Sequence, residues 1–390
     1  MTAPRVTAGR PAAAAPARSP SLSIWALAGV LLALWGLLGA LPQTRSFFLT
    51  DRNLANLMTQ VSHIAIIAVG MTLVILIKGI DLSVGAGVAL TGVVAALLQI
   101  DHGAPAAVAI AAALGTGLAI GLVQGAAIAR FDIPAFVVTL AGFNAYRGLA
   151  LVASDARGLS PMRDDFAILV ADLPPALTGA AIAVGAGLAI ATAIRTARRR
   201  AALGLDAPPP VRVAARCAVA VALAGGLWFV FGRRGMPVPV ALAAAAVAGG
   251  AFVTRRTRFG RHLYAIGGNA EAARLAGIDV RRATVIAYTA LGGLTALGGV
   301  VLAARTNGVT PGNAGHLLEL DVITAVVIGG TSLFGGRGSV VGSLLGALLL
   351  GTLSSGMNAL EIDSNWQLIV KGAVLMAAAL VDVASRRNRP

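Results

Sequence analysis

Residues 22–41 read LSIWALAGVLLALWGLLGAL, a run of 20 residues without a charged side chain. An α-helix rises about 1.5 Å per residue, so this run is long enough to cross the roughly 30 Å hydrocarbon core of a bilayer. It is too long for the apolar core of a cleavable signal peptide, which favours a first membrane span that is retained. The Ala-, Pro- and Arg-rich residues 1–21 have the composition of a disordered segment.

The composition extends this membrane character to the whole chain of 390 residues. Hydrophobic residues make up 57% and charged residues 12%, and the mean hydropathy is +0.83. A soluble domain is about 45–50% apolar and about 25% charged, so a soluble globular enzyme and a disordered chain are both excluded. The alternating strands of a membrane β-barrel would not raise the mean hydropathy this far. Because helices satisfy their own backbone in lipid, the sequence predicts an all-α polytopic membrane protein.

Twelve membrane spans are predicted along the chain. Three of them, 84–100, 214–232 and 318–336, are short or carry charges at an end, and they are the candidates for re-entrant or broken helices. The twelve ranges are 22–41, 54–77, 84–100, 104–128, 134–152, 174–194, 214–232, 237–254, 283–304, 318–336, 338–359 and 365–383.

Basic residues are divided unequally between the loops of this arrangement. With the N-terminus in the cytoplasm, 21 of the 31 Lys and Arg residues fall in cytoplasmic segments and 7 in outside segments. The positive-inside rule then predicts an even number of spans and cytoplasmic N- and C-termini, with the basic loops 195–212 and 255–282 inside. The net charge of +15 therefore indicates contact with anionic membrane lipid and an acidic protein surface rather than with nucleic acid.

No residue pattern in the chain supplies catalytic chemistry. Neither lysine follows a glycine as a phosphate-binding loop requires, and the four histidines lack the spacing of metal ligands. We therefore expect a protein that is not an enzyme and holds no metal or cofactor, with any ATP hydrolysis performed by another subunit. The one cysteine, Cys217, is expected to be a small packed residue.

Few ionisable residues lie at the predicted membrane depth, and most lie near span ends, where long side chains reach the interface. None is a carboxylate at the middle of a span, which disfavours an ion-coupled carrier. The residues concerned are Lys78, Asp81, Arg147, Glu319, Asp321 and Lys371.

Small residues inside the spans predict close helix contacts, because glycine lets two backbones approach. The clearest patterns are Gly115-x-Gly117-x-x-x-Gly121 and the pairs Gly292-Gly293 and Gly298-Gly299. Loop 153–173 is the longest predicted outside loop, and it is interpreted either as a docking rim for a partner or as a solvated connector.

The basic segment 255–282 is predicted to contain a short helix in a cytoplasmic loop. Asn269 can cap a helix over 270–276, Glu271 complements the dipole in its first turn, and Gly277 ends it. Such a helix offers a partner protein a surface to bind; the alternative is an interfacial connector.

This segment resembles the coupling-helix region of sugar permeases of bacterial ATP-binding-cassette importers, in the ribose/xylose/branched-chain amino acid permease superfamily. Three further motifs carry the resemblance: GIDLSVG at 79–85, IPAFVVTLAGFNAYRGLAL at 133–151 and VVIGGTSLFGGRGSVVGSLLGALLLG at 326–351. Relative to ribose-type permeases, residues 175–234 are an inserted pair of spans, as in the long D-xylose type. The resemblance therefore implies a 10-span core plus this pair.

The resemblance implies a permease domain over 22–383 with a cytoplasmic tail at 384–390, located in the bacterial inner membrane. It also implies a homodimer that forms the translocation path, a cytoplasmic ATPase and an extracytoplasmic sugar-binding protein. The expected substrate is D-xylose. Ribose, galactose or a branched-chain amino acid in the same architecture is the alternative, and an ion-coupled transporter is a second one.

Two sets of site residues follow from the resemblance and from polarity. Each pair of path residues has an alternative: a helix cap for span 84–100 at Asp81 and Ser83, a structural hydrogen bond near a span end at Asn144 and Arg147, and satisfaction of a helix break at 329–330 by Thr331 and Ser332. The expected ATPase-coupling residues are Gly268, Asn269, Glu271, Ala272, Arg274 and Gly277, and the expected path residues are Asp81, Ser83, Asn144, Arg147, Thr331 and Ser332.

Overall fold

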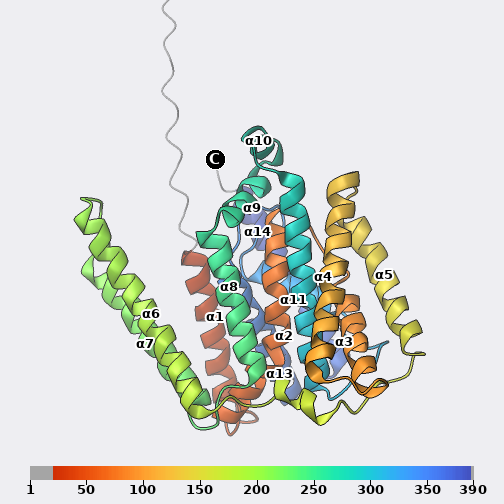
Figure 1. Ribbon diagram of the computed structural model, residues 1–390. Helices are drawn as coiled ribbons and strands as arrows, with labels where there is room; N and C mark the ends of the chain where they lie inside the picture. The colour runs from red at the N-terminus through yellow and green to blue at the C-terminus, as the bar shows by residue number, and fades with distance from the viewer. Residues whose placement is uncertain (1–20, 388–390) are drawn as a thin grey trace, which may run out of the picture.

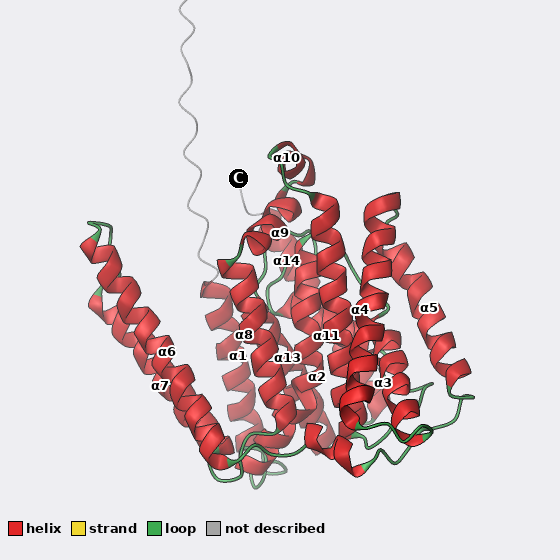
Figure 2. Ribbon diagram, viewed as in Figure 1, coloured by secondary structure: helices red, strands yellow, loops and turns green. Residues whose placement is uncertain are grey.

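The computed structural model describes residues 21–387, which form helices joined by loops (Figure 2). The expected disordered segment 1–21 lies outside this range, apart from Ser21. The helices are α1 (Ser21–Ala40), α2 (Asp51–Leu76), α3 (Val84–Ile100), α4 (Ala106–Phe131), α5 (Ala135–Ala153), the 3₁₀ helix η1 (Asp164–Leu169), α6 (Pro175–Ala202), α7 (Pro210–Phe231), α8 (Val238–Arg256), α9 (Arg258–Gly268), α10 (Ala270–Leu275), α11 (Val280–Arg305), α12 (Leu318–Ile328), α13 (Val340–Ala359) and α14 (Ser364–Arg387).

The prediction of an all-helical, multi-pass membrane protein is confirmed. Within the described residues, nine helices are long and apolar enough to cross a membrane: α2, α4, α5, α6, α7, α8, α11, α13 and α14. α1 has 20 residues and is apolar, so it is also long enough to cross a membrane, whereas α3 has 17 residues and α12 only 11. α14 continues to Arg387, so the first part of the expected tail 384–390 is helical.

The predicted span 318–336 is helical only in its first part. α12 ends at Ile328, and the chain then turns through Gly330, Gly335 and Gly336, whose φ angles are 85°, 74° and 71°. Such left-handed backbone is open to glycine and cannot continue a right-handed helix. A half-length helix of about 17 Å therefore stands where the sequence predicts a full span.

α2 and α11 lie at the centre of the bundle (Figure 1). α2 is buried along most of its length, and its Met71 and Ile75 belong to the same cluster as Tyr288 and Leu291 of α11. Because lipid is as apolar as these side chains, close packing rather than removal from water holds such helices together.

Glycines make the contact between α4 and α11 especially close. A Cβ added at Gly121 would meet the backbone of Tyr288, and one at Gly292 would meet the carbonyl of Gly117. This confirms the close approach that the Gly117/Gly121 and Gly292 patterns predict. The prediction is wrong for Gly115, because a Cβ added there would meet no described atom within 4 Å.

α6 and α7 pair with each other and lean away from the remaining helices (Figure 1). At the base of this hairpin, Val230 and Phe231 pack with Leu54 of α2, and the Met236 amide donates a 2.9 Å hydrogen bond to Thr178 Oγ1. Farther along the hairpin, large apolar side chains such as Leu223 are exposed. The hairpin therefore presents an apolar surface suited to lipid.

The two ends of the bundle differ in what they carry. α10 and the turn at 203–209 lie at one end, which we call the α10 face, and the loops 41–50 and 154–174 lie at the opposite face (Figure 1). α3 and α12 each cover only part of the distance between the two faces.

Candidate transport site and partner surface

Residues 77–83 interrupt the helices between α2 and α3 inside the bundle. Lys78 has a positive φ of 66°, which turns the chain after α2. The Ile80 carbonyl accepts a 3.3 Å hydrogen bond from Thr139 Oγ1 and faces the Tyr288 hydroxyl at 3.5 Å. At membrane depth, non-helical backbone is tolerated only where protein or a water-filled cavity satisfies it, and here α5 and α11 supply the partners.

Asp81 and Ser83, two of the predicted path residues, form a buried polar cluster with Gln124 of α4. Ser83 donates from both its amide and its hydroxyl to Asp81 Oδ1, at 2.7 Å each, and Gln124 Nε2 donates to Ser83 Oγ at 2.8 Å. Ser83 occupies the position before α3, but its side chain makes no capping bond. The alternative interpretation of the Ser83 hydroxyl as a helix cap is therefore wrong.

A small cavity of about 10 Å³ borders this cluster. Thr295 of α11 also lines it; this side chain is 5% exposed, and its Oγ1 has no hydrogen-bond partner among the described residues. The volume is about that of one water molecule. The cluster can therefore take up a single water or hydroxyl group between α3, α4 and α11. Sequence reasoning missed Gln124 and Thr295, although each is a polar residue inside a long apolar run.

Arg147 of α5 joins this region to the loop before α12. Its Nη1 atom donates to the carbonyls of Pro311 and Ala314 at 2.6 and 2.7 Å. Glu319, in the first turn of α12, is 7% exposed; its Oε2 lies against Gly85 at the start of α3 and has no hydrogen-bond partner within residues 21–387. The N-terminal ends of two short helices thus meet around a buried carboxylate, in the manner of the broken helices that form transporter sites.

The other predicted path residues lie elsewhere. Asn144 is exposed on α5, and its Nδ2 donates to the carbonyl of Leu140, one turn before it. Thr331 and Ser332 lie in the turn after α12, where Thr331 Oγ1 accepts from the Ser339 amide at 3.4 Å. Ser332 donates to Asp382 Oδ2 of α14 at 2.9 Å. These bonds favour the interpretation that Thr331 and Ser332 hold the helix break together.

The predicted short helix is present as α10, one residue shorter than expected. Asn269 Oδ1 accepts a 3.0 Å hydrogen bond from the Ala272 amide, Glu271 lies in the first turn, and Gly277 has a φ of 83° just beyond the helix. Ala273 packs with Ile266 and thereby fixes α10 against α9. The capping and stop signals predicted from the sequence are confirmed.

α9, which the sequence analysis missed, holds α10 on the bundle. Thr257 Oγ1 caps α9 by accepting from the Gly260 amide at 3.1 Å. Gly267 touches the backbone of Leu76 at the end of α2 and of Gly336 in the turn after α12. Movement of α10 is therefore connected mechanically to the two interrupted regions of the bundle. Leu275, at the end of α10, is 85% exposed and offers an apolar contact for a partner.

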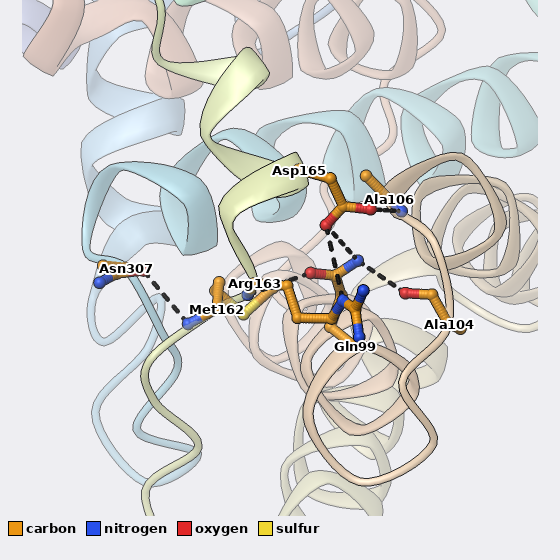
Figure 3. Close-up of polar contacts among 7 residues, drawn as sticks. All are labelled: Gln99, Ala104, Ala106, Met162, Arg163, Asp165 and Asn307. Carbon is orange, nitrogen blue, oxygen red and sulfur yellow. Dashed lines mark hydrogen bonds and ion pairs between the residues drawn. The ribbon is translucent and has the colours of Figure 1, made fainter.

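At the opposite face, loop 154–174 is anchored to the ends of three helices (Figure 3). Asp165 Oδ2 accepts from the Ala106 amide at 2.7 Å and so caps α4 from outside the helix, and this bond holds the pKa of Asp165 below its ordinary value. Gln99 Oε1 of α3 accepts from the Arg163 amide at 3.3 Å. Asn307, just beyond α11, accepts from the Met162 amide at 3.2 Å. The loop is thus an ordered part of this face.

Comparison with known proteins places the chain among permeases. The family model described as "Branched-chain amino acid transport system / permease component" matches residues 53–379. The chain is 40% identical to the xylose transport system permease protein XylH of Escherichia coli (strain K12), over 88% of each chain. It is 36% identical to the Haemophilus influenzae XylH, over 88% of this chain and 92% of the relative.

A ribose permease is also similar. The ribose import permease protein RbsC of Escherichia coli (strain K12) is 38% identical over 90% of this chain and 92% of the relative. No solved structure matches the chain. With the family model matching most of its length and such relatives matching along nearly all of both chains, the chain belongs to the branched-chain amino acid transport system / permease component family.

Proposed function

We propose that the chain is the membrane permease subunit of an ATP-binding-cassette importer that carries D-xylose across the bacterial inner membrane. The observation that carries this proposal is the 40% identity to a xylose permease along 88% of both chains. A separate cytoplasmic ATPase supplies the energy, and an extracytoplasmic sugar-binding protein delivers the sugar. Two copies of the chain form the functional permease.

The coupling surface of this proposal is α10. Its two end signals, Asn269 and Gly277, define a short helix on an otherwise basic face, and α9 connects it to the end of α2 and to the turn after α12. A force applied by the ATPase would therefore reach the bundle through α9. Gly268, Glu271, Ala272 and Arg274 complete the proposed contact set.

Three of the six path residues expected from the sequence remain in the proposed path. Asp81, Ser83 and Arg147 surround the meeting point of α3 and α12, together with Gln124 and Glu319. The sugar hydroxyls exchange hydrogen bonds with such groups as the two short helices move. The turn that contains Thr331 and Ser332 serves as a hinge near the α10 face. Asn144 is exposed on α5 and is left out of the path.

The proposed topology has twelve membrane-crossing or membrane-inserted helices, with both termini and α10 in the cytoplasm. Its support is the division of 21 basic residues against 7 between the two sides. Reporter fusions at Arg199 and Arg256 should give cytoplasmic signals, and fusions at Asp164 and Asn358 extracytoplasmic ones. A cytoplasmic signal at Asp164 overturns the topology.

Uptake with competitors tests the substrate. Cells that lack their own xylose permease, and that express this chain with its ATPase and binding protein, should accumulate labelled D-xylose. Excess unlabelled D-xylose should abolish the uptake of the label. The same excess of ribose, galactose or L-valine should reduce that uptake by less than half. Uptake of labelled ribose or L-valine instead would assign the chain to that solute.

A further inference from the structure

A cavity of about 330 Å³ lies toward the face opposite α10, between the first half of α3, the end of α11 and two loops. Val88 and Leu302 are among the side chains that line its helix side, and the loop segments 158–160 and 308–315 contribute the rest. Ligand pockets span roughly 300–1,000 Å³, so this cavity has room for one small molecule such as a single sugar ring.

The walls of the cavity are held in place by bonds on both loops. Leu159 and Val309 exchange two backbone hydrogen bonds, of 2.9 and 2.8 Å. The network in Figure 3 anchors the first loop beyond Ser160, through Met162, Arg163 and Asp165. Arg147 holds the second loop by its bonds to the Pro311 and Ala314 carbonyls. The cavity is therefore preformed, which lowers the ordering cost of binding.

Three polar side chains that line the cavity are free to bind a ligand. Ser160, Thr310 and Asn313 make no side-chain hydrogen bond to any other described residue, and together they offer two hydroxyls and an amide. Gly92 and Gly299, on the helix side, add further lining without bulky side chains. An apolar wall opposite a few hydrogen-bonding groups suits a sugar ring, which has both C–H and O–H surfaces.

The cavity lining contains no charged side chain. An amino acid carries an ammonium and a carboxylate, and each would need a charged or strongly polar partner when it leaves water. Arg147 does not line the cavity; its Nη1 is already bonded to two loop carbonyls. The lining therefore favours a neutral polyol over a zwitterion, a distinction that bears on a family described by branched-chain amino acids.

We propose that this outer cavity binds one neutral monosaccharide, with Ser160, Thr310 and Asn313 hydrogen-bonding its hydroxyls, and that it discriminates against amino acids. The proposal rests on the proposed function in that the solute is a sugar. It goes beyond it by giving the permease its own selective site, apart from that of the binding protein.

Thiol protection tests the site without requiring transport. Cys217 is the only cysteine, so a Cys217→Ala chain carrying Ala314→Cys has one reporter thiol on the cavity lining. In nanodiscs, D-xylose should slow modification of this thiol by a membrane-impermeant maleimide, and L-valine should not. Asn365→Cys, at an exposed position near the start of α14, is the matched control and should react at the same rate with either solute.

Two further variants connect protection to the named side chains. Thr310→Val and Asn313→Ala should each raise the xylose concentration for half-protection about two- to tenfold, the range for one lost hydrogen bond. If the Ala314→Cys chain fails gel filtration, Gly158→Cys serves as the reporter, since Gly158 also lines the cavity and an added Cβ there would come no closer than 4.0 Å to a described neighbour.

Xylose uptake by the full transporter without any protection at these positions would overturn the cavity site and leave the proposed function standing. Protection by L-valine in place of D-xylose would overturn the discrimination, and amino acid uptake by the same chain would overturn the proposed function as well.

Discussion

Removing both end signals of α10 should weaken ATPase binding strongly. Asn269→Ala deletes the acceptor of the 3.0 Å bond from the Ala272 amide, and the loss of such a cap costs about 1 kcal/mol. Gly277→Ala forces a side chain onto a φ of 83°, at a cost of roughly 1–2 kcal/mol. No atom of residues 21–387 lies within 4 Å of the added Cβ, so the cost of the Gly277→Ala change is conformational.

Together the two changes destabilise the helical form of α10 by about 2–3 kcal/mol, which corresponds to a roughly 30- to 150-fold lower ratio of helical to unwound α10. A helix of six residues has no stability of its own in water, so α10 depends on these ends and on the packing of Ala273. Once the helical form is the minor state, the apparent affinity of a partner that binds it falls in proportion to its population.

The assay is binding of the purified ATPase to the permease in nanodiscs, measured by surface plasmon resonance. Thr50→Val is the matched control, because it removes a cap from α2 at the opposite face, where Thr50 accepts from the Asn53 amide at 3.3 Å. The control should bind the ATPase as the unaltered chain does. If the Asn269→Ala/Gly277→Ala chain also binds with unaltered affinity, α10 is not the coupling surface.

Three further predictions concern the bundle itself. Lys371→Met should destabilise the protein by roughly 3 kcal/mol, because it leaves Asp321, now 2.9 Å from the ammonium and only 23% exposed, without its partner. The added change Asp321→Asn should restore the melting temperature in detergent, and a double variant as unstable as the single one would contradict this. Gly121→Leu should abolish the monodisperse gel-filtration peak by forcing α4 from α11, whereas Gly115→Leu should keep it, since that position faces open space. The pKa of Asp165 is lower in the folded loop than its ordinary value of 3.8, so the ionised carboxylate stabilises the loop at pH values above 3.8. This stabilisation is lost as the pH falls through the pKa of the folded state. Proteolysis of loop 154–174 should increase in that acid range, and Asp165→Asn should flatten the transition.

The apolar runs predicted most helix positions because length and charge alone decide what can cross a bilayer. The run 84–100 coincides with α3, including its early start after Ser83. The same reasoning predicted too long a helix at 318–336, where α12 ends at Ile328. Glycines extend an apolar run in the sequence, but those with left-handed backbone after Ile328 cannot continue the helix. α9 was missed for the opposite reason: its arginines make an amphipathic helix look like a loop.

The candidate site was only partly accessible from the sequence. Asp81 and Ser83 stand out as polar residues in a short motif, and their bonds to each other are local. Their contact with Gln124 joins positions far apart in the chain, and it depends on how α3 and α4 pack. The unpartnered Thr295 hydroxyl likewise becomes visible only when the surrounding side chains are placed.

The contacts of the loop before α12 could not be predicted from the sequence either. Arg147 is conspicuous in the sequence, but the carbonyls that it binds, at Pro311 and Ala314, carry no sequence signal. The outer cavity arises from that arrangement, so its lining could not be derived from composition or spacing.

Reconstituted transport tests the central claim most directly. Proteoliposomes holding the purified chain and its ATPase, with xylose-loaded binding protein on the side opposite α10, should accumulate labelled D-xylose only when ATP is supplied on the α10 side. Accumulation should persist when an uncoupler removes every proton gradient. Xylose accumulation that needs a proton or sodium gradient and ignores ATP would contradict the account of this chain as an ATP-coupled permease.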